Sequence, residues 1–63
     1  MRFLTIYAMD DKGEPFEKMI NIDRIESIWN DGMGGCVIQL IGMRQEDFII
    51  TAESFDQISK LLA

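Results

Sequence analysis

This chain cannot form the internal cross-links that small domains ordinarily use. Its 63 residues include a single cysteine, Cys36, and no histidine, so neither an internal disulfide nor a zinc site of the Cys/His type can form. A single core in a chain of this length rarely supplies more than about 3–5 kcal/mol of stability. Oligomerisation is the remaining common source of stability for small domains, and we therefore expect a homo-oligomer.

The cysteine itself begins an apolar run, which indicates a buried structural thiol. A nucleophilic cysteine needs a base beside it, and the usual base, histidine, is missing. A free thiol fits a reducing compartment, so we expect a cytoplasmic location. The apolar segment at the N-terminus is too short and too mixed for a signal peptide, and no run approaches the about 18 apolar residues of a membrane span.

Five short runs rich in β-branched and aromatic residues predict strands that are separated by turn signals. These strands are expected at residues 3–9, 16–22, 25–29, 36–41 and 48–51. Both faces of the first run are apolar, one formed by Leu4, Ile6 and Ala8 and the other by Phe3, Tyr7 and Met9. Such a strand is buried on both faces, or it is buried on one face and meets a partner with the other.

The stretch NDGMGGCVIQL, residues 30–40, places three glycines within four residues. A phosphate-binding loop of the Walker type needs a lysine after its glycines and a helix behind them, whereas a strand-like run follows here. Glycine adopts positive φ at little cost, and asparagine and aspartate tolerate it, so the stretch predicts a hairpin turn. Asp23, further upstream, predicts a single helical turn or a bulge between the second and third strands.

Ser54 predicts the N-cap of a C-terminal helix, and Gln57 three residues later completes a capping-box pattern. We expect the apolar face of this helix to pack on the sheet; its residues are Phe55, Ile58, Leu61 and Leu62. The sequence therefore predicts a single α+β domain over residues 1–63. It consists of a small, twisted, mainly antiparallel sheet of four or five strands with one C-terminal helix across a face.

The charge and the residue types of the chain argue against several partners and activities. Its formal net charge is −5, from eleven acidic and six basic residues, which argues against nucleic acid and anionic membranes because Lys and Arg supply most of the affinity for phosphate. Pairs of carboxylates occur at residues 10–11 and 46–47 and around the helix start. Their positions in turns indicate solvated acids, and no ligand spacing predicts a metal site or a cofactor. Without histidine or an activated nucleophile, we expect no enzymatic activity.

From Phe16 to the C-terminus the chain resembles the small flagellar FlbD-type (SwrD) swarming-motility proteins and short phage and prophage proteins of the same outline. The resemblance rests on INIDRIESI at residues 20–28, CVIQL at 36–40 and FIITAESFDQI at 48–58. The shared pattern is a strand, an Asn-x-x-x-Ile-Glu-x-Ile element, a glycine turn, a hairpin, a Glu-Ser step and a closing helix. This chain departs from it in a longer N-terminal strand and turn and in a short C-terminus. The resemblance implies a small accessory protein without enzymatic activity, and it carries over no catalytic residue.

The favoured functional hypothesis is a small non-enzymatic cytoplasmic accessory or regulatory protein that binds a protein partner as a homo-oligomer. Tryptophan and tyrosine are enriched at protein interfaces. We therefore expect the contact surface at an apolar edge around Phe3, Tyr7 and Trp29.

The alternative hypothesis is a phage-encoded anti-defence protein that sequesters a small anionic, nucleotide-like ligand or blocks a defence protein. Guanidinium groups bind phosphate in bidentate fashion, so sequestration would require Arg2, Arg24 or Arg44 to meet at an interface. The favoured hypothesis thus places the site at aromatic side chains, and the alternative places it at arginines.

Overall fold

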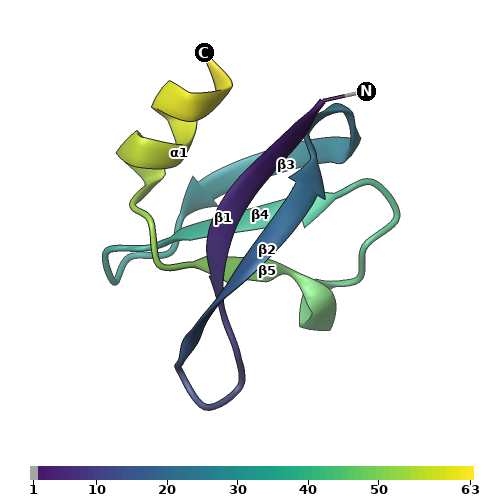
Figure 1. Ribbon diagram of the computed structural model, residues 1–63. Coiled ribbons are helices and arrows are strands. Elements are labelled where there is room, and N and C mark those ends of the chain that lie inside the picture. The colour runs from purple at the N-terminus through teal and green to yellow at the C-terminus, as the bar shows by residue number, and fades with distance from the viewer. Residues whose placement is uncertain (1) are drawn as a thin grey trace.

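The computed structural model describes residues 2–63, and its strands form one antiparallel sheet with a helix at the C-terminal end. The elements are β1 (Phe3–Met9), β2 (Pro15–Asn21), the 3-10 helix η1 (Ile22–Arg24), β3 (Ile25–Asn30), β4 (Cys36–Leu40), the 3-10 helix η2 (Gln45–Asp47), β5 (Ile49–Thr51) and α1 (Phe55–Leu62). The order of strands across the sheet is β2-β1-β5-β4-β3. The predicted α+β fold is confirmed (Figure 1).

The short strand β5 joins two hairpins, β1–β2 and β3–β4, into one sheet. It pairs with β4 over its whole length, from Cys36↔Thr51 to Ile38↔Ile49. Its register with β1, by contrast, is the single pair Ala8↔Thr51. The two hairpins therefore diverge beyond this pair, and Figure 1 shows them crossing at a steep angle.

The core lies on one face of the sheet, beneath α1. Its buried apolar residues are Ile6, Ala8, Ile20, Cys36, Ile38, Ile49 and Ile58. The capping box is present: the Ser54 side chain accepts from the backbone N–H of Gln57, whose side chain accepts from that of Ser54. The helical face was predicted correctly for Ile58 but wrongly for Leu61, which is 54% exposed. Phe55 and Leu62 also pack against the core, so the buried face of α1 runs through Phe55, Ile58 and Leu62, and Leu61 lies beside it.

The glycine stretch forms the predicted hairpin turn between β3 and β4, and the side-chain oxygens of Asp31 and Asn30 accept hydrogen bonds from its backbone. Asp31 Oδ1 accepts from the backbone N–H of Met33 at 2.7 Å and of Gly35 at 2.9 Å. Asn30 Oδ1 accepts from Gly32 at 2.8 Å. The asparagine and aspartate that signal the turn in the sequence therefore also order it through hydrogen bonds.

Two polar residues, Thr51 and Glu53, connect three strands. Thr51 is 2% exposed; its hydroxyl accepts from the Cys36 N–H at 3.3 Å and donates to the Glu53 carbonyl at 2.8 Å. The Glu53 carboxylate accepts from the Tyr7 N–H at 3.0 and 3.2 Å. These bonds hold β1 and β4 to the end of β5, where regular pairing with β1 stops.

Candidate binding surface

The sheet face opposite the core carries the exposed side chains predicted for the first strand. Phe3 and Tyr7 are 51% and 50% exposed, and Met19 on β2 is 63% exposed. Met19 pairs directly with Thr5, so it lies between the other two on the same face. We call Phe3, Tyr7 and Met19 the hairpin patch. Phe3 and Tyr7 belong to the predicted contact surface, whereas Met19 was not predicted as a contact residue.

Trp29 lies on the same face of the sheet but at its far side, so Phe3, Tyr7 and Trp29 do not form the single apolar edge that was expected. Trp29 is on β3, and both β4 and β5 lie between that strand and β1. Its ring packs edge-on against Phe48, with 5.4 Å between centroids and 81° between planes. Sequence could not place β5 between the hairpins, because the pairing joins the two ends of the chain.

Two pockets lie where β1 and β5 part, at the border of the face opposite the core. Met9 and Ile50 line both pockets, so we describe them as the two halves of one groove. Their volumes are about 330 and 550 Å³, and the smaller half also takes in Ala8, Phe16 and Lys18 from the core side of the β1–β2 hairpin. Ile50 is 46% exposed and shares the face opposite the core with Val37 and Trp29, through the pairs Val37↔Ile50 and Trp29↔Val37. We call this feature the Met9 groove. Its floor is apolar, and Met33, which is 92% exposed, stands at the rim of the larger half.

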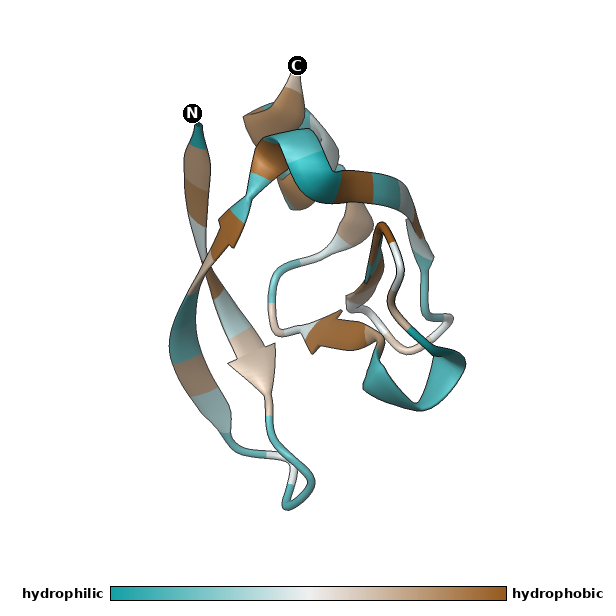
Figure 2. Cartoon of the chain, turned by 90° about the vertical axis from the view of Figure 1, so that its right-hand side faces the viewer, coloured by the Kyte–Doolittle hydropathy of each residue, from teal (hydrophilic) through white to brown (hydrophobic). Residues whose placement is uncertain are grey.

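The rim of the Met9 groove is acidic. The smaller half is lined by four carboxylates and one ammonium, a formal charge of −3: Asp10, Asp11, Glu46, Asp47 and Lys18. The larger half adds one carboxylate, that of Asp31. Figure 2 shows hydrophobic β5 between the hydrophilic β1–β2 turn and hydrophilic η2. An anionic ligand would therefore be repelled from the concave region that the structure describes.

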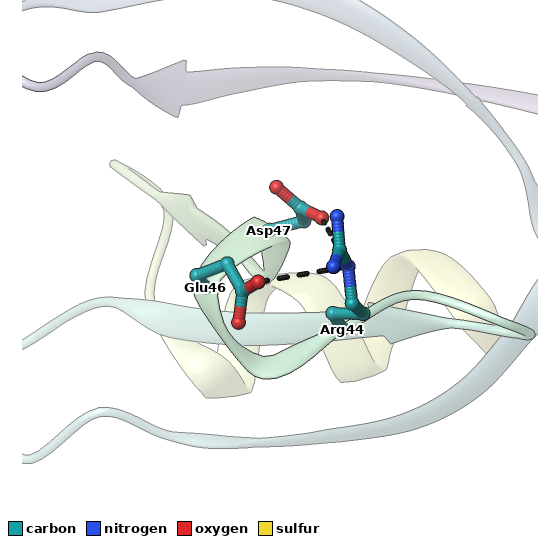
Figure 3. A network of polar contacts seen from close by, with 3 residues as sticks. All are labelled: Arg44, Glu46 and Asp47. Carbon is teal, nitrogen blue, oxygen red and sulfur yellow. Dashed lines mark ion pairs between the residues drawn. The ribbon is translucent and has the colours of Figure 1, made fainter.

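The arginines of the alternative hypothesis do not line this groove. Arg44 precedes η2, and its Nε lies 3.5 Å from a carboxylate oxygen of Glu46 and 3.9 Å from one of Asp47 (Figure 3). Arg24 belongs to η1, and Arg2 is brought close to it because the Ile22 N–H donates to the Arg2 carbonyl at 2.9 Å. Arg2 precedes β1 while Met9 ends it, which separates them by roughly 20 Å at about 3.3 Å per residue.

Both free edges of the sheet are protected against the addition of another strand. The β2 edge begins with Pro15, and Lys18, which pairs with buried Ile6, lies on the core-side face. Proline and inward-facing charges both discourage edge-to-edge pairing. The β3 edge carries a register shift between Ile25 and Ser27, and a bulge of this kind has the same effect. A partner is thus expected to meet the face of the sheet, not its edges.

Cys36 is the buried structural thiol that the sequence predicted, at 0% exposure. Burial raises the pKa of the thiol, the backbone hydrogen bond with Trp29 opposes that rise, and the Asp31 carboxylate adds to it. The thiol is therefore protonated and inaccessible in the folded chain. It is not available as a nucleophile.

We expect Cys36 to react with Ellman's reagent at pH 8 only as fast as the chain unfolds, so denaturing urea should raise the rate sharply.

The stability of the chain should also fall at alkaline pH. Because the pKa of the Cys36 thiol in the folded chain lies above the unfolded value of about 8.5, the neutral thiol stabilises the fold fully below that value. This stabilisation is lost as the pH rises through the folded pKa. Urea titrations from pH 7 to 10 should show the loss in the native chain but not in Cys36→Ala. Equal alkaline losses in both proteins would contradict this account.

Comparisons with known proteins leave the function to be argued from this surface. No family model matches the chain, and neither a curated protein nor a solved structure matches it. Within residues 2–63 no three acidic or cysteine side chains are grouped to hold a metal ion. In the same part of the chain, no helix is long and apolar enough to cross a membrane.

Proposed function

We propose that the chain is a small non-enzymatic accessory protein of the cytoplasm that binds a protein partner with the helix-free face of its sheet. The observation that carries this proposal is the exposure of Phe3, Tyr7, Met19 and Ile50 on that face. An antiparallel sheet with one face in water normally presents polar residues there. Apolar groups gathered on a protein surface mark interaction sites.

The chemistry of the chain supports binding over catalysis. Its thiol is buried, and histidine is absent from the sequence. Two of the carboxylates beside the groove are occupied in turns, since Asp10 and Asp31 each accept two backbone N–H groups. The resemblance to FlbD-type proteins favours the same accessory role. The free cysteine favours a reducing compartment such as a cytoplasm.

The hairpin patch is also where we expect two copies of the chain to meet. An acidic protein repels its own copies, so self-association needs a surface without uncompensated charge. Phe3, Tyr7 and Met19 provide apolar side chains for such a contact, with Glu17 beside them at its margin, and both sheet edges are protected. A domain of this size gains stability from burying that area against a second copy.

Site-specific photo-crosslinking in the cells that make this protein tests the proposal. With a photo-reactive amino acid in place of Met19 or Ile50, we expect covalent adducts with another polypeptide. An adduct of twice the chain mass at position 19 would identify the homo-oligomer, and a heavier or lighter adduct would identify a partner.

Asp56 provides the matched control, because it is exposed on α1, away from the helix-free face. The same photo-reactive group at position 56 should give no adduct. Adducts at position 56 alone, or none at positions 19 and 50, would refute binding through the helix-free face.

A further inference from the structure

The Met9 groove has a chemistry that specifies what kind of partner segment fits it. We propose that it takes a basic, apolar segment of the partner protein, in which large apolar side chains alternate with lysine or arginine. This inference rests on the proposed function and names the chemistry of the partner segment that meets the sheet where β1 and β5 part.

The floor of the groove calls for apolar side chains. Met9 and Ile50 line both halves, and Ile50 keeps 46% of its surface exposed although it belongs to the central strand of the sheet. The halves, at about 330 and 550 Å³, fall in the range of small-ligand pockets. Burying apolar side chains there would remove both residues from water.

The rim calls for positive charge. The smaller half has four carboxylates against the one ammonium of Lys18. Asp10 is held in position, because its Oδ1 accepts from the N–H groups of Lys12 and Glu14 at 2.9 and 2.8 Å. A partner that brings two or three positive charges would be attracted to this rim and would neutralise it.

The chain already places a guanidinium on two of these carboxylates. Arg44 lies against Glu46 and Asp47 (Figure 3), and the side chains of all three are more than half exposed. Ion pairs this exposed are weak, so a basic residue of a partner can replace Arg44 at little cost. The internal pair thus shows that the rim accepts a guanidinium, while leaving it free to exchange.

Other occupants fit the groove less well. Nucleotides, nucleic acid and acidic peptides meet the negative rim. A second copy of the chain has a formal net charge of −5 and would be repelled as well. A partner strand added in line with the sheet would have to use the edges at β2 and β3, which are protected by Pro15, Lys18 and a bulge.

Fluorescence anisotropy with three labelled peptides tests the inference. All alternate leucine or phenylalanine with a second residue, which is lysine in the first peptide, glutamine in the second and glutamate in the third. We expect the lysine peptide to bind the full chain about tenfold or more tightly than the glutamine peptide, and the glutamate peptide not to bind. Affinity for the lysine peptide should fall as salt is raised, because exposed charges are screened.

Two paired variants locate the site. Glu46→Gln combined with Asp47→Asn should weaken lysine-peptide binding about tenfold, because it removes two rim charges. Asp23→Asn combined with Asp56→Asn removes the same charge away from the groove and should leave binding unchanged. Ile50→Ala should weaken both the lysine and the glutamine peptides, because it shortens the floor. Urea unfolding of both paired variants is the control, and each variant should unfold as the native chain does.

The outcomes separate this inference from the proposed function. Equal binding of the three peptides, equal effects of the two charge pairs, or no peptide binding overturns the inference. The proposed function still stands in those cases if photo-crosslinks form at positions 19 and 50. If Ile50→Ala instead abolishes self-association without affecting any peptide, the occupant is a second copy and the inference is wrong.

Discussion

Ile38→Ala is expected to leave much of the chain unfolded at 25 °C in the absence of denaturant. Ile38 is 0% exposed and pairs with Ile28 on one side and Ile49 on the other. Cutting a fully buried isoleucine to alanine costs about 2–5 kcal/mol, from lost transfer energy and the cavity left behind. A core of this size supplies only about 3–5 kcal/mol in total, so the one substitution removes most of the stability.

The single tryptophan, Trp29, reports unfolding by fluorescence because its ring packs against Phe48 in the folded chain. Urea titrations of Ile38→Val should show a smaller loss, about 0.5–1.5 kcal/mol. Ile50→Ala is the matched control, because Ile50 lies on the adjacent strand but faces the groove. This substitution should reduce the free energy of unfolding by much less than Ile38→Ala does. If Ile50→Ala destabilised the chain as much as Ile38→Ala, the assignment of core and outer faces would be wrong.

Local sequence signals predicted nearly all of the elements, because each depends on neighbours in the chain. The strand predicted at residues 3–9 matches β1, with Ile6 and Ala8 buried and Tyr7 half exposed. The helical turn predicted at Asp23 is η1, and the cap at Ser54 is present. Where a predicted strand end differs from the observed one, the difference is one residue. At the C-terminal end of β2, for example, Ile22 enters η1 instead of extending the strand.

Long-range arrangement could not be predicted from the same signals. Turn chemistry and alternation define each hairpin, but nothing local states that β5 pairs with β1 through Ala8↔Thr51. That one pair separates Trp29 from Tyr7 and opens the Met9 groove beside it. The acids around the groove were assigned to turns from the sequence. That they meet at one rim depends on η2 lying near the β1–β2 turn, and Asp10 and Asp11 from that turn line the smaller half together with Glu46 and Asp47 from η2.

Gly35 illustrates how such a long-range contact constrains a residue that local reasoning treats only as part of a turn. A Cβ built on Gly35 would lie 2.6 Å from the Thr51 carbonyl oxygen and 2.8 Å from Asp31 Oδ2. The first of these atoms belongs to the backbone of the central strand β5, and Gly35 itself is buried. The alanine side chain could therefore be accommodated only by moving β5 away from β4.

Gly35→Ala is expected to destabilise the chain by about 2–3 kcal/mol, the upper part of the range for overpacking. The neighbouring Gly34 is the control, since its φ of +95° disfavours alanine but nothing lies within 4 Å of its Cβ position. Gly34→Ala should cost about 1–2 kcal/mol, from the left-handed backbone alone. Urea titration followed by Trp29 fluorescence compares the two.

A double-mutant cycle identifies which contact makes Gly35→Ala costly. Asp31→Ala removes the side-chain contact and leaves the Thr51 carbonyl in place, so most of the cost of Gly35→Ala should persist in that background. Persistence would place the constraint on the backbone of β5, where the β3–β4 turn meets the strand that joins both hairpins. A cost that vanished with Asp31 would place it within the turn, and β5 would then be free to shift beside the Met9 groove.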